Sequence, residues 1–298
     1  MNTLIVLLGP TGVGKTELSL QMAERYSSPI LNCDSRQLFR GLGIGTAAPT
    51  PAQMERVQHY FVGTLDIHDY YSAARYEAEC LALLSSLFQK HSRLILSGGA
   101  MLYIDAVCRG IDDIPTIDDA TRLQVKQDLA ERGLENLYAE LQQLDPAYAA
   151  IVDRRNTRRV VHAVELCRMT GKTYTSFRTN GCKQRPFHIL KIGLNRPREE
   201  LFARINSRVD RMMADGLLEE ARRMLPFREA NALNTVGYKE MFKVLDGEWP
   251  LPMAVERMKK NTRVYAKKQL TWFAKDPDIH WFHPDETEAI FNFIDQNS

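Results

Sequence analysis

The sequence predicts an α/β fold in which a parallel sheet is flanked by helices and interrupted by an all-helical insertion domain. Three observations predict it. Short apolar runs alternate with segments whose apolar residues recur at helical spacing, the pattern of a parallel sheet covered on both faces. The first apolar run ends in a glycine-rich loop that leads into a helix. After residue 117 the alternation gives way to one helical segment after another.

The expected strands are short and apolar. The N-terminal run TLIVLL is rich in β-branched and aliphatic residues and stops at Gly9. The run PILNC ends just before Asp34, RLIL leads into a Ser-Gly-Gly turn, and HILKIGL returns the chain to the sheet after the helical region. The expected strands are residues 3–8, 29–33, 93–96 and 188–194.

The expected helices divide the chain into two domains. Amphipathic spacing predicts core helices at residues 15–26, 72–91, 197–224 and 251–275. Between them, the segments DDATRLQVKQDLAERG, LENLYAELQQLD and TRRVVHAVELCRMTG are helical without an intervening strand. We therefore expect a core domain of residues 1–116 and 187–298 and a helical insertion domain of residues 117–186.

Composition indicates a soluble globular protein. A chain of 298 residues with 44% apolar residues can bury a large core. No apolar run approaches the roughly 20 residues of a bilayer span, so no membrane association is expected. The five cysteines are scattered and never form a C-x-x-C pair, which favours a reducing cytoplasm and no structural zinc.

The net charge of +2 hides an uneven distribution. Residues 1–150 hold 12 Lys and Arg against 18 Asp and Glu, a net charge of −6. Residues 151–298 hold 27 against 19, a net charge of +8. A basic half is a weak indication of a polyanionic partner such as nucleic acid.

The loop after the first strand fits the P-loop pattern G-x-x-x-x-G-K-[ST], and it lies between a strand and a helix as that motif requires. Small residues let backbone N–H groups point at an anion, and the helix N-terminus adds a favourable dipole. A lysine then reaches the distal phosphate, while a Ser or Thr hydroxyl holds Mg²⁺. The phosphate-binding residues are Gly9, Pro10, Thr11, Gly12, Val13, Gly14, Lys15 and Thr16.

A hydrolytic P-loop protein usually has a second apolar strand that ends in an aspartate metal ligand. Here the best such strand ends in Ser97-Gly98-Gly99 instead. Asp34 does follow the second strand, at the edge where parallel sheets bind their ligands. It could be a metal ligand, a general base or a capping residue for the turn that follows. This pattern favours a transferase that uses the loop to hold a phosphorylated donor.

Several separate motifs occur in a fixed order. They are the P-loop, DSRQLF at 34–39, IGTAAP at 44–49, GGAMLY at 98–103, GKT at 171–173, the stretch 204–217, VGY at 236–238 and KQLTWF at 268–273. Together they resemble the tRNA dimethylallyltransferases, also called isopentenyl-tRNA transferases. Many kinases share a P-loop, whereas D-S-x-Q, I-G-T-A-x-P and Q-x-T-W in this order are specific. The resemblance covers residues 1 to about 273.

The resemblance implies an activity and a donor site. Members of this family join the dimethylallyl group of dimethylallyl diphosphate to the exocyclic N6 amine of the adenosine 3′ of the anticodon in tRNA. The match implies that Lys15 and Thr16 hold the diphosphate and Mg²⁺, Thr16 being the metal ligand. Arg208 is expected to reach the same leaving group. Asp34 and Arg208 are the expected catalytic residues, Asp34 as the general base that accepts the proton of the amine.

The resemblance also implies a tRNA-binding set. A stacked adenine cannot present its amine to a buried carbon, so the base is expected to be flipped into a channel. Each basic run among these residues could instead be only a solvated face. The expected tRNA-binding residues are Asp34, Ser35, Arg36, Gln37, Ala100, Arg122, Arg158, Arg159, Val160, Val161, His162, Val236, Gly237, Tyr238, Lys239, Lys267, Lys268, Gln269, Thr271 and Trp272.

One position departs from the family pattern, and two other classes of function compete. Ala100 stands where relatives commonly carry a hydroxyl residue, usually Thr, and a methyl group cannot position an amine or a phosphate oxygen. A small-molecule or nucleoside kinase would share the P-loop fold, and an RNA-binding protein could retain the loop without chemistry. The pair His280 and His283 is interpreted as packing rather than metal binding. A monomer is expected.

Overall fold

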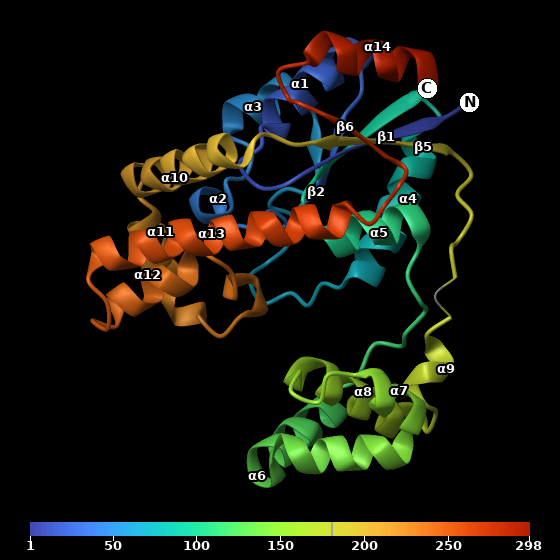
Figure 1. Ribbon diagram of the computed structural model, residues 1–298, viewed down its shortest axis with the longest axis vertical. Helices are drawn as coiled ribbons and strands as arrows, with labels where there is room; N and C mark the ends of the chain where they lie inside the picture. Colours follow the sequence, from blue (N-terminus) through green and yellow to red (C-terminus); the bar gives the residue numbers. More distant parts are fainter. Residues whose placement is uncertain (180) are drawn as a thin grey trace. The chain divides into compact units, whose positions relative to one another are not determined.

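A computed structural model gives the structure of the chain and describes residues 1–179 and 181–298 (Figure 1). The chain forms two compact units, one of Met1–Cys108 with Gln184–Ser298 and one of Arg109–Lys183. The sequence-based division at residues 117 and 186 rested on where the helical pattern begins and ends. The observed boundaries fall at residues 108/109 and 183/184 instead. At these boundaries the chain enters and leaves the second unit, and the N–H of Lys183 donates a 2.7 Å hydrogen bond to the carbonyl of Arg109.

The first unit is built on a six-stranded sheet in the order β3-β2-β4-β1-β5-β6, and every neighbouring pair is parallel. The four predicted strands are confirmed. The short strand β3 and the edge strand β6 were not predicted, because β3 has only two residues and β6 exposes His280 and Trp281. The strands are β1 Thr3–Leu8, β2 Ile30–Cys33, β3 His59–Tyr60, β4 Arg93–Gly98, β5 His188–Leu194 and β6 Ile279–Phe282.

The central strand β1 shows why this sequence forms a sheet covered on both faces. Its six residues are all buried, and successive side chains point to opposite faces of the sheet. Leu4 and Val6 belong to one hydrophobic cluster, and Ile5 and Leu7 belong to another. Alternate residues of this apolar run therefore pack into the two hydrophobic cores on opposite faces of the sheet.

Helices of the first unit cover these two faces (Figure 1). The predicted helix at 15–26 is confirmed, whereas the one at 197–224 is divided at Gly216, which has a φ of +96°. The helices are α1 Lys15–Tyr26, α2 Gly43–Thr46, α3 Pro51–Arg56, α4 Ala73–Leu87, α5 Met101–Arg109, α10 Arg198–Ala214, α11 Leu217–Met224, α12 Tyr238–Leu245, α13 Leu251–Phe273 and α14 Thr287–Asn297, with short 3₁₀ turns at Leu225–Phe227 and Asn231–Leu233.

The second unit is helical and has its own core. Residues such as Val125, Leu141 and Val164 form a hydrophobic cluster within it. The carboxylate of Asp145 accepts hydrogen bonds from Tyr148 N and Thr175 N, which fixes two helix starts together and lowers the pKa of Asp145 against the opposing effect of its burial. The helices are α6 Asp119–Leu144, which bends at Gly133, α7 Pro146–Ile151, α8 Thr157–Thr170 and α9 Tyr174–Phe177.

The sheet brings three sequence features to one edge. Since β1, β4 and β2 are adjacent and parallel, their carboxyl ends place the P-loop, the turn after Gly98 and Asp34 side by side. Among the described residues, no helix is both long enough and apolar enough to cross a membrane.

Candidate functional site

A cavity of about 1190 Å³ lies at this edge, within the first unit. The P-loop, the end of β2, the loop that contains α2, and α10 line it. Lys15, Asp34 and Arg208 are all among the lining residues. The structure therefore brings together the donor-site residues and the base expected from the sequence.

The P-loop backbone requires its glycines. Gly9, Gly12 and Gly14 have φ values of +148°, +83° and +119°, which L side chains rarely adopt. A Cβ atom at Gly9 would lie 2.6 Å from the carbonyl oxygen of Leu194, so packing against β5 also excludes a side chain there. Gly14 is the N-cap of α1, which places the helix N-terminus at the cavity.

Lys15 lies folded onto the loop, where its Nζ donates 2.9 Å hydrogen bonds to the carbonyls of Gly9 and Pro10. Its pKa is lowered to about 7, chiefly by burial and further by the nearby Arg208 guanidinium, while Asp34 acts in the opposite direction. A half-buried ammonium held only by carbonyls is poised to exchange them for an anion.

Arg208 extends from α10 across the same cavity. Its Nη1 donates to Thr11 Oγ1 at 3.3 Å and its Nη2 donates to the carbonyl of Thr46 at 3.4 Å. Burial lowers its pKa, and Asp34 opposes that shift. Two half-buried basic side chains therefore lie close together with a single nearby carboxylate, and this excess positive charge favours a ligand that carries at least two negative charges.

Asp34 combines the capping role and an available oxygen. Its Oδ1 accepts hydrogen bonds from the backbone N–H groups of Arg36, at 2.8 Å, and Gln37, at 3.4 Å. Across the described part of the chain, Oδ2 has no hydrogen-bond partner. Tyr265, which is 39% exposed, also lines the cavity. One oxygen of Asp34 thus orients the carboxyl group while the other is free to accept a proton.

Three of the residues predicted to bind tRNA have side chains in the protein interior. Gln269 is 2% exposed, and its amide accepts from Thr11 N at 2.9 Å and donates to Gly99 O at 2.8 Å, which ties α13 to the P-loop. Tyr238 and Val160 are fully buried. In this conformation these side chains cannot contact an RNA directly, because the core covers them.

Two other members of that set support the cavity. Gln37 donates 3.0 Å hydrogen bonds from Nε2 to the carbonyls of Thr46 and Ala47. Ala100 is buried after β4, and its N–H donates to the carbonyl of Cys33 at 3.2 Å. The remaining members near this edge are Ser35 and Arg36 after β2, with Val236, buried Gly237 and exposed Lys239 around the start of α12.

The last turns of α13 present an exposed polar and aromatic surface. Lys267, Lys268, Thr271 and Trp272 are all exposed there. Lys267 Nζ lies 5.4 Å from the centroid of the Phe202 ring, beside a hollow of about 520 Å³. Trp272 Nε1 donates to Asp105 Oδ2 at 2.8 Å, which leaves the rest of the indole at the surface.

The second unit carries a separate basic surface at the start of α8. Arg158 and Arg159 are exposed in its first turn, where the N–H of Arg159 donates to the capping side chain of Asn156. Val161 and His162 are half-buried on the same helix, and Arg122 is half-buried on α6. The two predicted tRNA-binding surfaces thus occupy different units.

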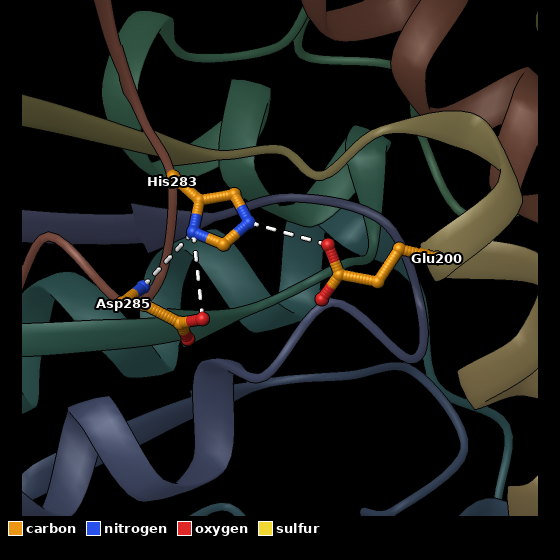
Figure 2. Close-up of side chains that lie close together, drawn as sticks. All are labelled: Glu200, His283 and Asp285. Atoms are coloured by element: carbon orange, nitrogen blue, oxygen red, sulfur yellow. Dashed lines mark hydrogen bonds and ion pairs between the residues drawn. The ribbon is translucent and has the colours of Figure 1, made fainter.

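The only cluster of His, Cys and acidic side chains found within metal-binding distance among the described residues is Glu200, His283 and Asp285 (Figure 2). His283 Nε2 lies 3.4 Å from Glu200 Oε2 and its Nδ1 lies 3.7 Å from Asp285 Oδ2. The guanidinium of Arg196 pairs with both carboxylates, at 2.7 Å from Asp285. A fixed cation already compensates the acids, which disfavours a metal ion. His280 instead packs against Phe293 in a tilted arrangement, with ring centroids 4.4 Å apart.

The same cluster explains residues that the sequence analysis did not assign. Arg196, held by Glu200 and Asp285, donates from Nε to the carbonyl of Val13 at 2.9 Å. Arg204 donates from Nε to the carbonyl of Gly12 at 3.0 Å. Two arginines thus fix the carbonyl groups of Gly12 and Val13 in the P-loop. No local pattern distinguishes them from surface charges, since their role arises from the return of β5 and β6 to the loop.

Thr16 is the residue of the P-loop suited to a metal ion. It is exposed at the start of α1 and lines the cavity together with Asp34. Hydroxyl and carboxylate oxygens are the ligands Mg²⁺ prefers, and the ion also keeps several waters. The residues present therefore fit a magnesium ion bound jointly with a phosphorylated ligand.

Fold and site define a P-loop transferase, in which a cavity lined by the P-loop and an available carboxylate is accompanied by exposed basic surfaces on two units. The description of the family model that matches residues 37–276 is IPP transferase. The chain belongs to this family, whose curated members are tRNA dimethylallyltransferases.

Its relatives match over nearly the whole chain. It is 60% identical over 296 residues to tRNA dimethylallyltransferase 2 of Parabacteroides distasonis, covering 99% of each protein. It is 62% identical over 293 residues to tRNA dimethylallyltransferase 1 of Phocaeicola vulgatus, covering 98% of each. Among solved structures, the full-length tRNA isopentenylpyrophosphate transferase of Bacillus halodurans has a TM-score of 0.72 and 32% identity, with 99% of this chain and 96% of that chain covered. A eukaryotic dimethylallyltransferase acting on tRNA has a TM-score of 0.78 and 26% identity, with coverage of 95% and 74%.

Proposed function

We propose that the chain transfers a dimethylallyl group from dimethylallyl diphosphate to the exocyclic N6 amine of the adenosine 3′ of the anticodon in tRNA. The observation that carries the proposal is the cavity chemistry. Lys15 and Arg208 are half-buried in the same cavity without an ion pair among the described residues, and one oxygen of Asp34 is available beside them. A diphosphate would satisfy the two cations, and an amine would satisfy the carboxylate.

The donor half of the reaction uses the cations. The bond between the prenyl C1 and the diphosphate oxygen breaks, and the leaving group gains negative charge. Cations already fixed around that oxygen stabilise the developing charge without reorganisation. Lys15 lies on the loop and Arg208 extends across it, so they would hold the diphosphate from two sides. Mg²⁺, bound with Thr16 and the phosphate oxygens, would supply further charge neutralisation.

The acceptor half uses Asp34. A bond forms between N6 and C1 as the C–O bond breaks, and the N6 proton passes to Asp34 Oδ2. The Asx-type hydrogen bonds to Arg36 N and Gln37 N hold the carboxyl group during this transfer. The adenine would have to leave its stack to reach the cavity.

The kinase alternative is not favoured, because the family and all the relatives above are transferases that act on prenyl donors or tRNA. In addition, the strand β4 ends in Ser97 and Gly98 rather than in the aspartate that holds metal in hydrolytic P-loop proteins. We further propose that the enzyme acts as a cytoplasmic monomer.

A nucleoside assay tests the proposal. The protein is incubated with unmodified tRNA, Mg²⁺ and dimethylallyl diphosphate, and the digested nucleosides are analysed by mass. We expect one added dimethylallyl group on a single adenosine 3′ of the anticodon. ATP turnover that is stimulated by a small-molecule acceptor, without any prenylated nucleoside, would instead support a kinase.

The tRNA-binding surfaces predict a salt dependence. Log affinity for tRNA should fall linearly with log salt, with a slope of about −0.7 to −0.9 for each phosphate neutralised. Replacing Arg158 and Arg159 together, or Lys267 and Lys268 together, by alanine should make the slope shallower. Fluorescence anisotropy across a salt series measures it.

The matched control for this experiment is an exposed basic residue outside both surfaces, Lys90, replaced by alanine. We expect its slope to equal that of the unmodified protein. If neither double variant changed the slope, both basic runs would be solvated faces without contact to RNA.

A further inference from the structure

A buried carboxylate outside the cavity organises one of its walls. Glu220 on α11 is 3% exposed. Its Oε2 accepts a 2.9 Å hydrogen bond from the N–H of Ile44, and its Oε1 accepts from the N–H of Gly45 at 2.8 Å and from the hydroxyl of Tyr238 at 2.6 Å. Among the described residues it forms no salt bridge.

Burying the Glu220 carboxylate without a cation costs free energy, so its hydrogen-bond donors must compensate for the lost water. A buried carboxylate without a cation is stable only when several donors point at it, and here two of the donors are the N–H groups of the second and third residues of the short helix α2. The Tyr238 ring also lies against this helix, since a Cβ atom at Gly45 would approach ring atoms of Tyr238 to 2.7 Å. The neighbouring Tyr238 hydroxyl stays protonated, because burial and then Glu220 raise its pKa. Glu220 and Tyr238 therefore fix both the position and the orientation of α2.

The other end of α2 contacts the catalytic cavity. The carbonyl of Thr46 accepts from Gln37 Nε2 at 3.0 Å and from Arg208 Nη2 at 3.4 Å. The second amino group of Arg208 donates to Thr11 on the P-loop. A continuous series of hydrogen bonds thus runs from Glu220 through the backbone of α2 to the guanidinium of Arg208.

We propose that Glu220 is a positioning residue for Arg208: it holds α2 so that the Thr46 carbonyl orients the guanidinium toward the leaving group. The inference rests on the proposed function for the role of Arg208 in prenyl transfer. Neither oxygen of Glu220 lines the cavity, so it acts on the reaction only through α2. The same arrangement explains why the I-G-T-A-x-P motif has a glycine at position 45, because the Tyr238 ring occupies the space that a side chain would need.

The test is a double-variant cycle. Glu220→Gln keeps the size of the side chain but turns an amide N–H toward one of the backbone donors, so α2 should shift. We expect the single-turnover rate to fall about 10- to 100-fold, as for a displaced catalytic group. The Kd for tRNA should stay within twofold, and Tyr238→Phe should give a smaller loss in the same direction. In an Arg208→Ala background, Glu220→Gln should lower the single-turnover rate by less than threefold, since the guanidinium that Glu220 positions is gone.

The control separates positioning from stability. Glu77 is another buried glutamate, paired with Arg185 at 2.7 Å and absent from the cavity lining, and Glu77→Gln should lower the melting temperature without changing the rate per folded molecule. A full loss from Glu220→Gln in the Arg208→Ala background would show that Glu220 does not act through Arg208. A wild-type rate for Glu220→Gln would overturn the positioning role of Glu220 and leave the proposed function intact.

Failure of the proposed function is recognised separately. If the unmodified protein transferred no prenyl group, the affinity for inorganic diphosphate, measured by calorimetry, would still report on Arg208. Glu220→Gln should then weaken diphosphate binding in the unmodified background and not in the Arg208→Ala background. Equal weakening in both backgrounds would contradict the positioning role whatever reaction the enzyme performs.

Discussion

Lys15→Ala should lower kcat/KM for the prenyl donor by about 10²–10³-fold, the usual cost of removing one preorganised charge partner from a water-poor site. The loss should exceed that from an exposed cation because Lys15 is half-buried against the carbonyls of Gly9 and Pro10, where no other ammonium can replace it. Steady-state kinetics with a constant saturating tRNA concentration measures the effect. Lys15→Arg is the matched variant, since it keeps the charge but not the size.

The lowered pKa of Lys15 adds a pH dependence whose sign can be worked out. In the free protein this pKa is about 7, so at pH 8 most molecules carry a neutral amine. Diphosphate binds the charged form and raises the pKa, so binding above pH 7 must take up a proton. Donor affinity should therefore fall as pH rises from 7 to 9.

Calorimetry in two buffers of different ionisation enthalpy should detect this proton uptake at pH 8. Lys15→Arg should abolish the uptake, because a guanidinium remains charged over this range. Undiminished donor binding by Lys15→Ala would remove Lys15 from the donor site, whereas a pH profile shared by Lys15→Arg and the unmodified protein would show that another group takes up the proton.

Much of the core could be predicted from local patterns. Strand β1, the P-loop and α1 follow from an apolar run, small residues and helical spacing, all within 26 residues of the N-terminus. The position of Asp34 could also be predicted, because a residue that follows a parallel strand lies at the ligand edge of the sheet. These features depend on neighbouring residues, so the sequence is sufficient for them.

Other parts of the site depend on contacts between distant segments. Arg196 reaches the P-loop only because β5 returns beside β1, and its partner Asp285 lies in the C-terminal stretch that no motif marks. Strand β6 escaped prediction because an edge strand with exposed His280 and Trp281 has no continuous apolar run. Periodicity within one segment carries no signal for such contacts.

Membership in a motif also fails to distinguish residues that can contact tRNA from residues that hold the site together from the protein interior. Tyr238 and Gln269 lie in motifs that the resemblance associates with tRNA, yet both side chains are buried and bond to Glu220 and to the P-loop. By contrast, Lys267 and Lys268 in the same motif region as Gln269 are exposed. Helical periodicity accounts for the difference, since one side of α13 faces the core and the other faces solvent.

Asp34→Asn should reduce the single-turnover rate at least about 100-fold, within the range of 10²–10⁴ typical for loss of a general base. An adenine amine is a poor nucleophile, so removal of its proton as the bond to C1 forms should matter. The substitution is well matched to the geometry. The asparagine carbonyl can still accept from Arg36 N and Gln37 N, so the turn is kept, while the free Oδ2 is replaced by an amide that cannot accept a proton.

Binding measurements complete this test. The affinities for tRNA and for dimethylallyl diphosphate should remain within a few-fold, because neither the P-loop nor the basic surfaces change. Asp66→Asn is the control, since Asp66 Oδ1 accepts from the N–H of His68 in a similar exposed turn away from the cavity. It should keep the full rate. Were Asp34→Asn as fast as Asp66→Asn, the carboxylate would serve only to shape the turn, and the proton would have to leave the amine by another route, to water.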